Sequence, residues 1–362
     1  MISYVKYSPE MEKIPRNELA TIDQIGSMML ELADKVREKH GIAMKGTHAK
    51  SVGLTKAELT ILDSLPPELA QGLFAHKGTY EALVRYSPGP PEKLSDKASG
   101  QRGMSVKILG VHGPHLAESP ETTTQDFVLA VDPAFTSGDA KQFLQTFGRT
   151  AAHAPKFSEK TIIGASRVAR VLEGALEAVG LESANLKFIG RAPRHPVSDP
   201  YYSQAPIRYG QFVAKLAAFP TAATLGLVGK REVDTDDDEV FRHVTEEYFK
   251  RADAVYAIKV QLCTDEETMP IEDASVVWPE ESSPYRTVAM LRIPMQHSFS
   301  EARKAYFEDN LSFNPVHSLE QHRPLGSIMR ARMAVYKKVQ EFRQASNGTP
   351  PAEPANLAAV PD

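Results

Sequence analysis

Residues 331–343 have the sequence ARMAVYKKVQEFR and lie in a longer run, Pro324 to Gln344, that contains no glycine after its third residue. Such a run predicts a helix near the C-terminal end of the chain. Side chains that are four and seven residues apart lie on one face of a helix. We therefore expect Arg332, Tyr336 and Arg343 to share a face.

The pair of Arg332 and Tyr336 has a specific chemical use. A guanidinium beside a phenol favours the phenolate, which is the form that binds a hard ferric ion. Tyrosinate is also one of the few side chains used as an axial ligand of haem iron. The same spacing occurs where a surface cation packs on an aromatic ring, so this pair alone leaves both interpretations open.

The remainder of the chain consists mainly of short strands. Apolar residues recur at helical spacing between Ile22 and His40, which predicts an amphipathic helix, and a second helical stretch is predicted over Asp139 to Val179. Residues 345–362 are rich in Pro, Ala and Asn, and they predict a disordered tail. Runs rich in Val, Leu, Ile or Tyr predict strands over 57–62, 81–87, 103–111, 126–132, 211–219, 254–263 and 287–293. Many strands without regular intervening helices favour an antiparallel barrel or sandwich, so the predicted fold class is α+β.

Two segments nearer the N-terminus carry further candidate residues. His48 lies in a polar loop, and a histidine there could act as a general base that takes a proton from one oxygen of a peroxide and returns it to the other. Further along, strand alternation places Arg85 and Ser87 on one face. A cation that points into a barrel interior needs a partner, and a haem propionate would supply one. A solvent-facing histidine and an arginine at a strand end in water are the alternatives.

Composition excludes several classes of function. The chain has 362 residues, a formal net charge of -4 and no recurring Lys/Arg stripe, so nucleic acid is not an expected partner. A single cysteine, Cys263, excludes an intrachain disulfide framework and a Cys-rich metal site. No run reaches the roughly 18 apolar residues of a membrane span, and charges within the first thirty residues argue against a signal peptide. A cytoplasmic protein is expected.

Together these segments resemble the motifs of the haem catalases. The stretch Thr47 to Ser51 is similar to the motif around the distal histidine, and Val84 to Ser87 followed by Gln101 to Met104 is similar to the strand pair after it. The run Arg332 to Tyr336 resembles the proximal-ligand motif. The resemblance covers most of 45–343. It implies a single catalase-like domain over 1–344, with an antiparallel β-barrel core, surrounding helices, and haem between the barrel and the C-terminal helix.

The resemblance also implies roles for individual residues around haem b. His48 would be the distal acid-base residue, and Ser87 would hydrogen-bond its far ring nitrogen. Tyr336 would be the axial ligand of the iron, and Arg332 would keep it ionised. The side chains that would bind the haem and its propionates are Lys45, Arg85, Arg332, Tyr336 and Arg343.

Three departures from the catalase pattern bear on the reaction. The asparagine that orients peroxide in catalases is matched by Val131, or by Asp132 after a slip of one residue. Thr47 stands where many catalases have a valine, and its hydroxyl could hydrogen-bond an oxygen bound to iron. The chain is also shorter than a typical catalase, which implies a wider access route.

These departures favour a haem-dependent peroxidase that uses organic hydroperoxides, and hydrogen peroxide weakly, with a small organic electron donor. One alternative is a fatty-acid hydroperoxide rearrangement enzyme or lyase of the allene oxide synthase type, towards which an apolar Val131 would lean. The other is a non-catalytic haem-binding protein. The resemblance suggests a homodimer.

Overall fold

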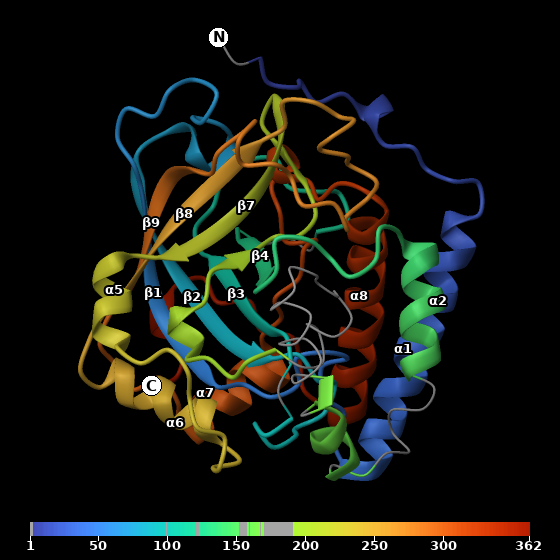
Figure 1. Cartoon of the computed structure of the whole chain (residues 1–362), viewed down its shortest axis with the longest axis vertical. Coiled ribbons are helices and arrows are strands. Elements are labelled where there is room, and N and C mark those ends of the chain that lie inside the picture. The colour runs from blue at the N-terminus through green and yellow to red at the C-terminus, as the bar shows by residue number, and fades with distance from the viewer. Residues whose placement is uncertain are drawn as a thin grey trace.

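The computed structural model describes residues 3–98, 100–119, 123–151, 158, 160–166, 168–169 and 191–362. Within these residues, an antiparallel sheet with the strand order β5-β4-β3-β2-β1-β9-β8-β7-β6 closes on itself because β5 also pairs with β7 (Figure 1). At the closure, Ala130 of β4 lies opposite Tyr202 of β5, which in turn lies opposite Ala217 of β7. All strands except β6 belong to the ring, so the predicted α+β fold with an antiparallel β-barrel is confirmed.

Seven strands follow the predicted runs closely, whereas the short strands β5 and β6 lie in none of them. Their bounds are β1 Gly53–Ile61, β2 Gly78–Pro88, β3 Arg102–Ile108, β4 Gln125–Ala130, β5 Tyr201–Tyr202, β6 Ile207–Tyr209, β7 Phe212–Pro220, β8 Ala254–Leu262 and β9 Arg286–Ile293. The helices are α1 Glu18–His40, α2 Ala140–Ala151, α5 Ala222–Val228, α6 Val240–Phe249, α7 Glu301–Ala305 and α8 Ser327–Asn347. A π-helical turn, Tyr306–Asn310, follows α7 directly. Much of the remainder of the helical stretch predicted over 139–179 lies outside the described residues.

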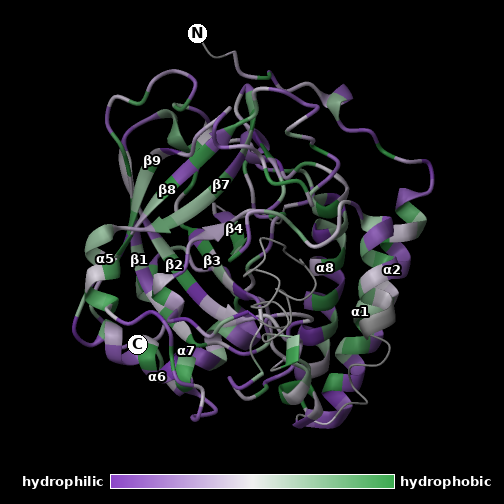
Figure 2. Cartoon of the chain, viewed as in Figure 1, coloured by the Kyte–Doolittle hydropathy of each residue, from purple (hydrophilic) through white to green (hydrophobic). Residues whose placement is uncertain are grey.

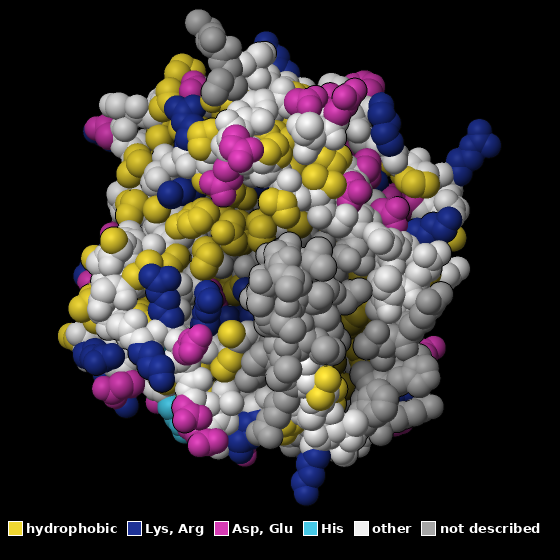
Figure 3. Space-filling view, viewed as in Figure 1, with side chains coloured by type: hydrophobic (Ala, Val, Ile, Leu, Met, Phe, Trp, Pro, Cys, Tyr) yellow, Lys and Arg dark blue, Asp and Glu magenta, His cyan; other side chains and the backbone are white. Residues whose placement is uncertain are grey.

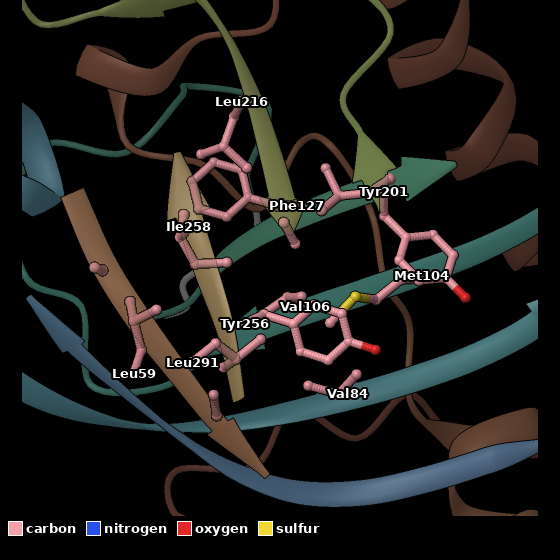
Figure 4. Packing of buried hydrophobic residues seen from close by; sticks show 14 of the residues in the cluster. Leu59, Val84, Met104, Val106, Phe127, Tyr201, Leu216, Tyr256, Ile258 and Leu291 are labelled. Atoms are coloured by element: carbon pink, nitrogen blue, oxygen red, sulfur yellow. The ribbon is translucent and has the colours of Figure 1, made fainter. Parts of the chain in front are cut away.

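Every second residue of each strand points into the barrel, and the side chains at these positions form an apolar core. On β2, Val84 and Tyr86 belong to this core. Figure 4 shows Val84 with Met104 and Val106 of β3 and Tyr256 of β8. All five side chains are at most 2% exposed. The interior is therefore filled by side chains, and a bound group has to lie outside the barrel.

Three helices form a layer beside the barrel, with α8 between the barrel and α1 (Figure 1). Ile22, Ile25 and Met29 of α1 pack against Val335 and Val339 of α8. Their spacing follows the helical repeat, and Figure 2 shows that α1 carries both hydrophobic and hydrophilic positions along its length. This packing fixes α8, and hence its side chains, relative to the strands.

The C-terminal segment differs from its predicted disorder. Residues 348–362 lie along the barrel, where Val360 is 3% exposed and packs in a cluster with Leu54 and Leu83. Glu353 forms an ion pair of 2.6 Å with Lys107, whose side chain is fully buried. The composition suggested too little to bury, but the segment is held by these contacts and by others, such as the ion pair of Asp362 with Lys56.

The surface and the helices add two observations. Acidic and basic side chains are interspersed among the described residues on the face shown in Figure 3, and hydrophobic side chains gather above its centre. In the described part of the chain, no helix combines the length and the hydropathy that a membrane crossing requires.

Candidate active site

A cavity of about 110 Å³ lies between the outer face of the barrel and α8. The residues around it include many that the sequence singled out, although these are far apart in the chain: Lys45, Thr47, His48, Arg85, Ser87, Tyr336 and Arg343. The fold therefore brings the three predicted motifs to one place.

Arg85 and Ser87 reach this cavity from the outer face of β2. The sequence led us to expect Arg85 to point into the barrel interior, and this expectation is wrong. Val84 and Tyr86 occupy the interior, so alternation turns Arg85 and Ser87 outward. An apolar interior has no room for the guanidinium, whereas the outer face offers it the Ser51 hydroxyl at 3.0 Å and the His48 carbonyl at 2.6 Å.

His48 lies over the ends of β2 and β3. Its Nδ1 is 3.1 Å from the Ser87 hydroxyl, which agrees with the predicted pairing of these two residues. Its backbone has φ 53°, in the left-handed region that few non-glycine residues adopt. Burial, and then repulsion from Arg85, lowers the pKa of His48 to about 4. The imidazole is therefore neutral near pH 7 and can accept a proton.

Gly103 on β3 makes the position of His48 possible. A Cβ atom at residue 103 would lie 2.8 Å from Cε1 and 3.0 Å from Nδ1 of His48. Real Cβ atoms essentially never come closer than about 3.0 Å to such a neighbour. The sequence identified Gly103 as part of a resembling motif but gave it no role. The structure shows that it provides the space for the histidine ring.

Tyr336 borders the cavity from α8. The guanidinium of Arg332 donates a hydrogen bond of 3.3 Å to the Tyr336 hydroxyl, and its central carbon lies 5.6 Å from the ring centroid. The neighbouring residues Val335 and Val339 are buried and pack against α1. The predicted partnership of Arg332 with Tyr336 is thus present. Arg332 reaches the site through the tyrosine and is not itself a lining residue.

Three cations surround the cavity, and none of them forms an ion pair with a carboxylate among the described residues. Lys45 donates to the carbonyl of Leu311 at 3.2 Å, and Arg343 donates to the carbonyls of Glu308 and Asp309 in the π-helical turn. Burial, then repulsion from Arg343 and Arg85, holds the pKa of Lys45 well below its ordinary value. Burial also lowers the pKa of Arg85 to about 10. This clustering of positive charge favours an anionic ligand.

Val131 does not reach the cavity, which corrects its assignment to the catalytic group. It lies in the barrel core with Phe127 and Leu129, because these three residues alternate on the same face of the chain. The other candidate, Asp132, pairs with Arg191. From β4, the cavity receives Val128 and Leu129 instead. The alternation of Phe127, Leu129 and Val131 was visible in the sequence and could have shown that Val131 faces inward.

Other lining residues were not predicted from the sequence. Ser105 of β3 and the loop residues Ser312 and Phe313 border the cavity, as does Met29 of α1. Because Ser105 is two residues after Gly103 on one strand, period-two alternation was the signal that could have identified it.

Comparison with known proteins supports the architecture. No family model matches the chain, and no curated protein matches it in sequence. Among solved structures, a fungal catalase aligns with a TM-score of 0.58 and 17% identity over 96% of this chain and 66% of its own. A bacterial catalase aligns with a TM-score of 0.56 and 14% identity, covering 94% and 63% of the two chains. Catalase A from Saccharomyces cerevisiae aligns with a TM-score of 0.55 and 13% identity, covering 95% and 67%.

The chain spans about two thirds of the length of these catalases. It has the catalase fold.

Proposed function

We propose that the protein is a haem-dependent peroxidase that reduces organic hydroperoxides, and hydrogen peroxide weakly, with electrons from a small organic donor. One observation carries the proposal: a single cavity combines the neutral base His48, held by Ser87, with the phenol of Tyr336, held by Arg332. A phenol-arginine pair and a buried neutral histidine have no structural need to share a cavity. Their combination is what a haem peroxide site requires.

The side chains around the cavity suit haem b by their chemistry. Lys45, Arg85 and Arg343 have no carboxylate partners among the described residues, so two propionates would supply the missing negative charge. Tyr336 would hold the iron through its phenolate oxygen, and Arg332 would stabilise that phenolate. The group, when bound, supplies an iron centre that exchanges electrons with a peroxide and with a donor.

The protein's own residues manage the proton. The Ser87 hydroxyl lies 3.1 Å from Nδ1 of His48, so Nε2 remains as the nitrogen that accepts the hydroperoxide proton. The same nitrogen can return that proton to the departing oxygen. Arg85 holds the carbonyl of His48 at 2.6 Å, which keeps the loop and the imidazole in position. Thr47 places a second hydroxyl beside the base.

The walls of the cavity favour a hydroperoxide with an organic substituent. Val128, Phe313 and Val335 give the cavity apolar surface. Apolar walls bind a hydrocarbon substituent through the hydrophobic effect, which hydrogen peroxide cannot use. The same surface supports a second candidate, the rearrangement or cleavage of a fatty-acid hydroperoxide. Val131 no longer supports it, because that side chain lies in the barrel core.

The cofactor is tested by expressing the protein with added haem and comparing its absorption spectrum with that of Tyr336→Phe. Tyr80→Phe is the matched control, because Tyr80 is on β2 but does not line the cavity. We expect a high-spin ferric spectrum in the wild type and in Tyr80→Phe, and a shifted or lost Soret band in Tyr336→Phe. A wild-type protein that takes up no haem would refute the proposal.

The reaction is tested with cumene hydroperoxide and a reducing dye. We expect His48→Ala to lower kcat/KM by about 10²–10⁴-fold. The exposed His76 provides the control variant His76→Ala, which should behave as the wild type. Rearranged products from linoleate hydroperoxide without any donor would favour the second candidate. Haem binding with no effect of His48→Ala on any turnover would leave a non-catalytic haem-binding protein.

A further inference from the structure

The outer faces of β2, β3 and β4 form a short polar surface under the cavity. In the strand register, Ser105 of β3 lies opposite Arg85 of β2 on one side and Val128 of β4 on the other. The next outward position of β3 is Gly103, which lies under the His48 ring. Ser105 is therefore one outward position, about 7 Å along the strand, from the residue that supports the base.

The Ser105 hydroxyl faces the cavity without a protein partner. Ser105 is 8% exposed and lines the cavity, and no residue of the described chain hydrogen-bonds its hydroxyl. Two other serine hydroxyls of the cavity are engaged: that of Ser87 with His48, and that of Ser312 with Glu353 at 3.0 Å. A hydroxyl in such surroundings is stabilised by a ligand that accepts its hydrogen bond.

We infer that Ser105 is a further catalytic residue that donates a hydrogen bond to an oxygen of the bound hydroperoxide, next to the oxygen that His48 serves. This inference rests on the proposed function. From the sequence, the peroxide-orienting position was matched to Val131 or Asp132, directly after β4. In this proposal Ser105 of β3 has that role, and its hydroxyl replaces the amide of the asparagine that orients peroxide in catalases.

Two features make Ser105 suitable for this task. It lies in the middle of a strand that is paired on both sides, so its Cα position is fixed before a ligand arrives. A donor that is already in place does not have to reorganise when negative charge develops on oxygen. Val128, which lies opposite Ser105 on β4, is apolar. Its side chain therefore cannot donate a hydrogen bond to the same oxygen.

The test uses fluoride, a small anion that binds ferric haem and accepts a hydrogen bond. Wild type, Ser105→Ala and Ser105→Thr are loaded with haem, and haem stoichiometry and the fluoride dissociation constant are measured by absorption. We expect Ser105→Ala to weaken fluoride binding by about tenfold, and Ser105→Thr to retain it, since a hydrogen bond to a charged acceptor has this strength. kcat/KM for cumene hydroperoxide should follow the same order.

The outcomes separate the two proposals. Unchanged fluoride affinity in Ser105→Ala, with full haem occupancy, would overturn the role of Ser105 and leave the proposed function intact. A fall in haem occupancy with unchanged fluoride affinity would place the hydroxyl on a propionate, which also overturns it. Equal weakening in both variants would show that packing is the cause. A wild type that binds no haem would overturn both proposals.

Discussion

Replacing Gly103 with alanine should displace the imidazole of His48 and lower the reaction rate, although His48 itself is unchanged. The new Cβ would lie 2.8 Å from Cε1 of His48, so the ring has to move by about 0.6 Å to reach the ordinary contact distance of 3.4 Å. Such a movement would take Nδ1, now 3.1 Å from the Ser87 hydroxyl, to or beyond the limit of a hydrogen bond. A base that is out of position by part of an ångström loses about 10–100-fold in rate.

The assay is kcat/KM for cumene hydroperoxide per bound haem, with the melting temperature measured in parallel. Gly226→Ala is the matched control, because a Cβ at that helical glycine would have no neighbour within 4 Å. We expect about 1–3 kcal/mol of destabilisation from Gly103→Ala, because overpacking has that cost, and none from the control. Full haem occupancy together with kcat/KM within twofold of the wild type would refute the reasoning.

Three further predictions concern other parts of the molecule. Because the pKa of His48 is about 4, the base stays neutral from pH 8 to 5, so kcat/KM should be flat there and fall with a midpoint near pH 4; a midpoint near 6.5 would contradict this. Glu353→Ala should lower the free energy of unfolding, measured in urea, by about 2 kcal/mol, because it removes one carboxylate from the buried Lys107. An unchanged urea midpoint would mean that this ion pair does not hold residues 348–362 on the barrel. Val131→Ala should lower the free energy of unfolding by about 2 kcal/mol, because it truncates a core side chain, and should leave kcat/KM per haem unchanged. A changed preference between hydroperoxides would show that Val131 does act at the site.

Local periodicity carried much of the fold prediction. The helical spacing between Ile22 and His40 became α1, which ends before Gly41 at φ 73°, the left-handed conformation that glycine adopts without strain. The strands were equally local, since alternation and turn residues define them without knowledge of the rest of the chain. The partnership of Arg332 with Tyr336 was also predictable, because the helix itself sets the distance between them.

The failures have a different origin. The ion pair of Glu353 with Lys107 joins residues far apart in the sequence, and composition cannot report such a contact. The left-handed backbone of His48 and the clearance over Gly103 depend on how a loop meets a strand. Which face of β2 points inward depends on barrel closure, so Arg85 was assigned to the wrong side. Val131 was assigned to the site for a simpler reason. It was aligned with the asparagine of the catalase motif, and the alternation of Phe127, Leu129 and Val131 was not considered.

The alternation of β2 has a consequence for how this protein can change. One strand supplies Val84 and Tyr86 to the barrel core and Arg85 and Ser87 to the cavity. Substitutions can therefore alter either surface almost independently, one side chain at a time. A single inserted or deleted residue would do the opposite, because it would exchange the two sets, putting a guanidinium in the core and a tyrosine at the cavity. Length variation is expected in the loops between strands, and the strands themselves should vary by substitution alone.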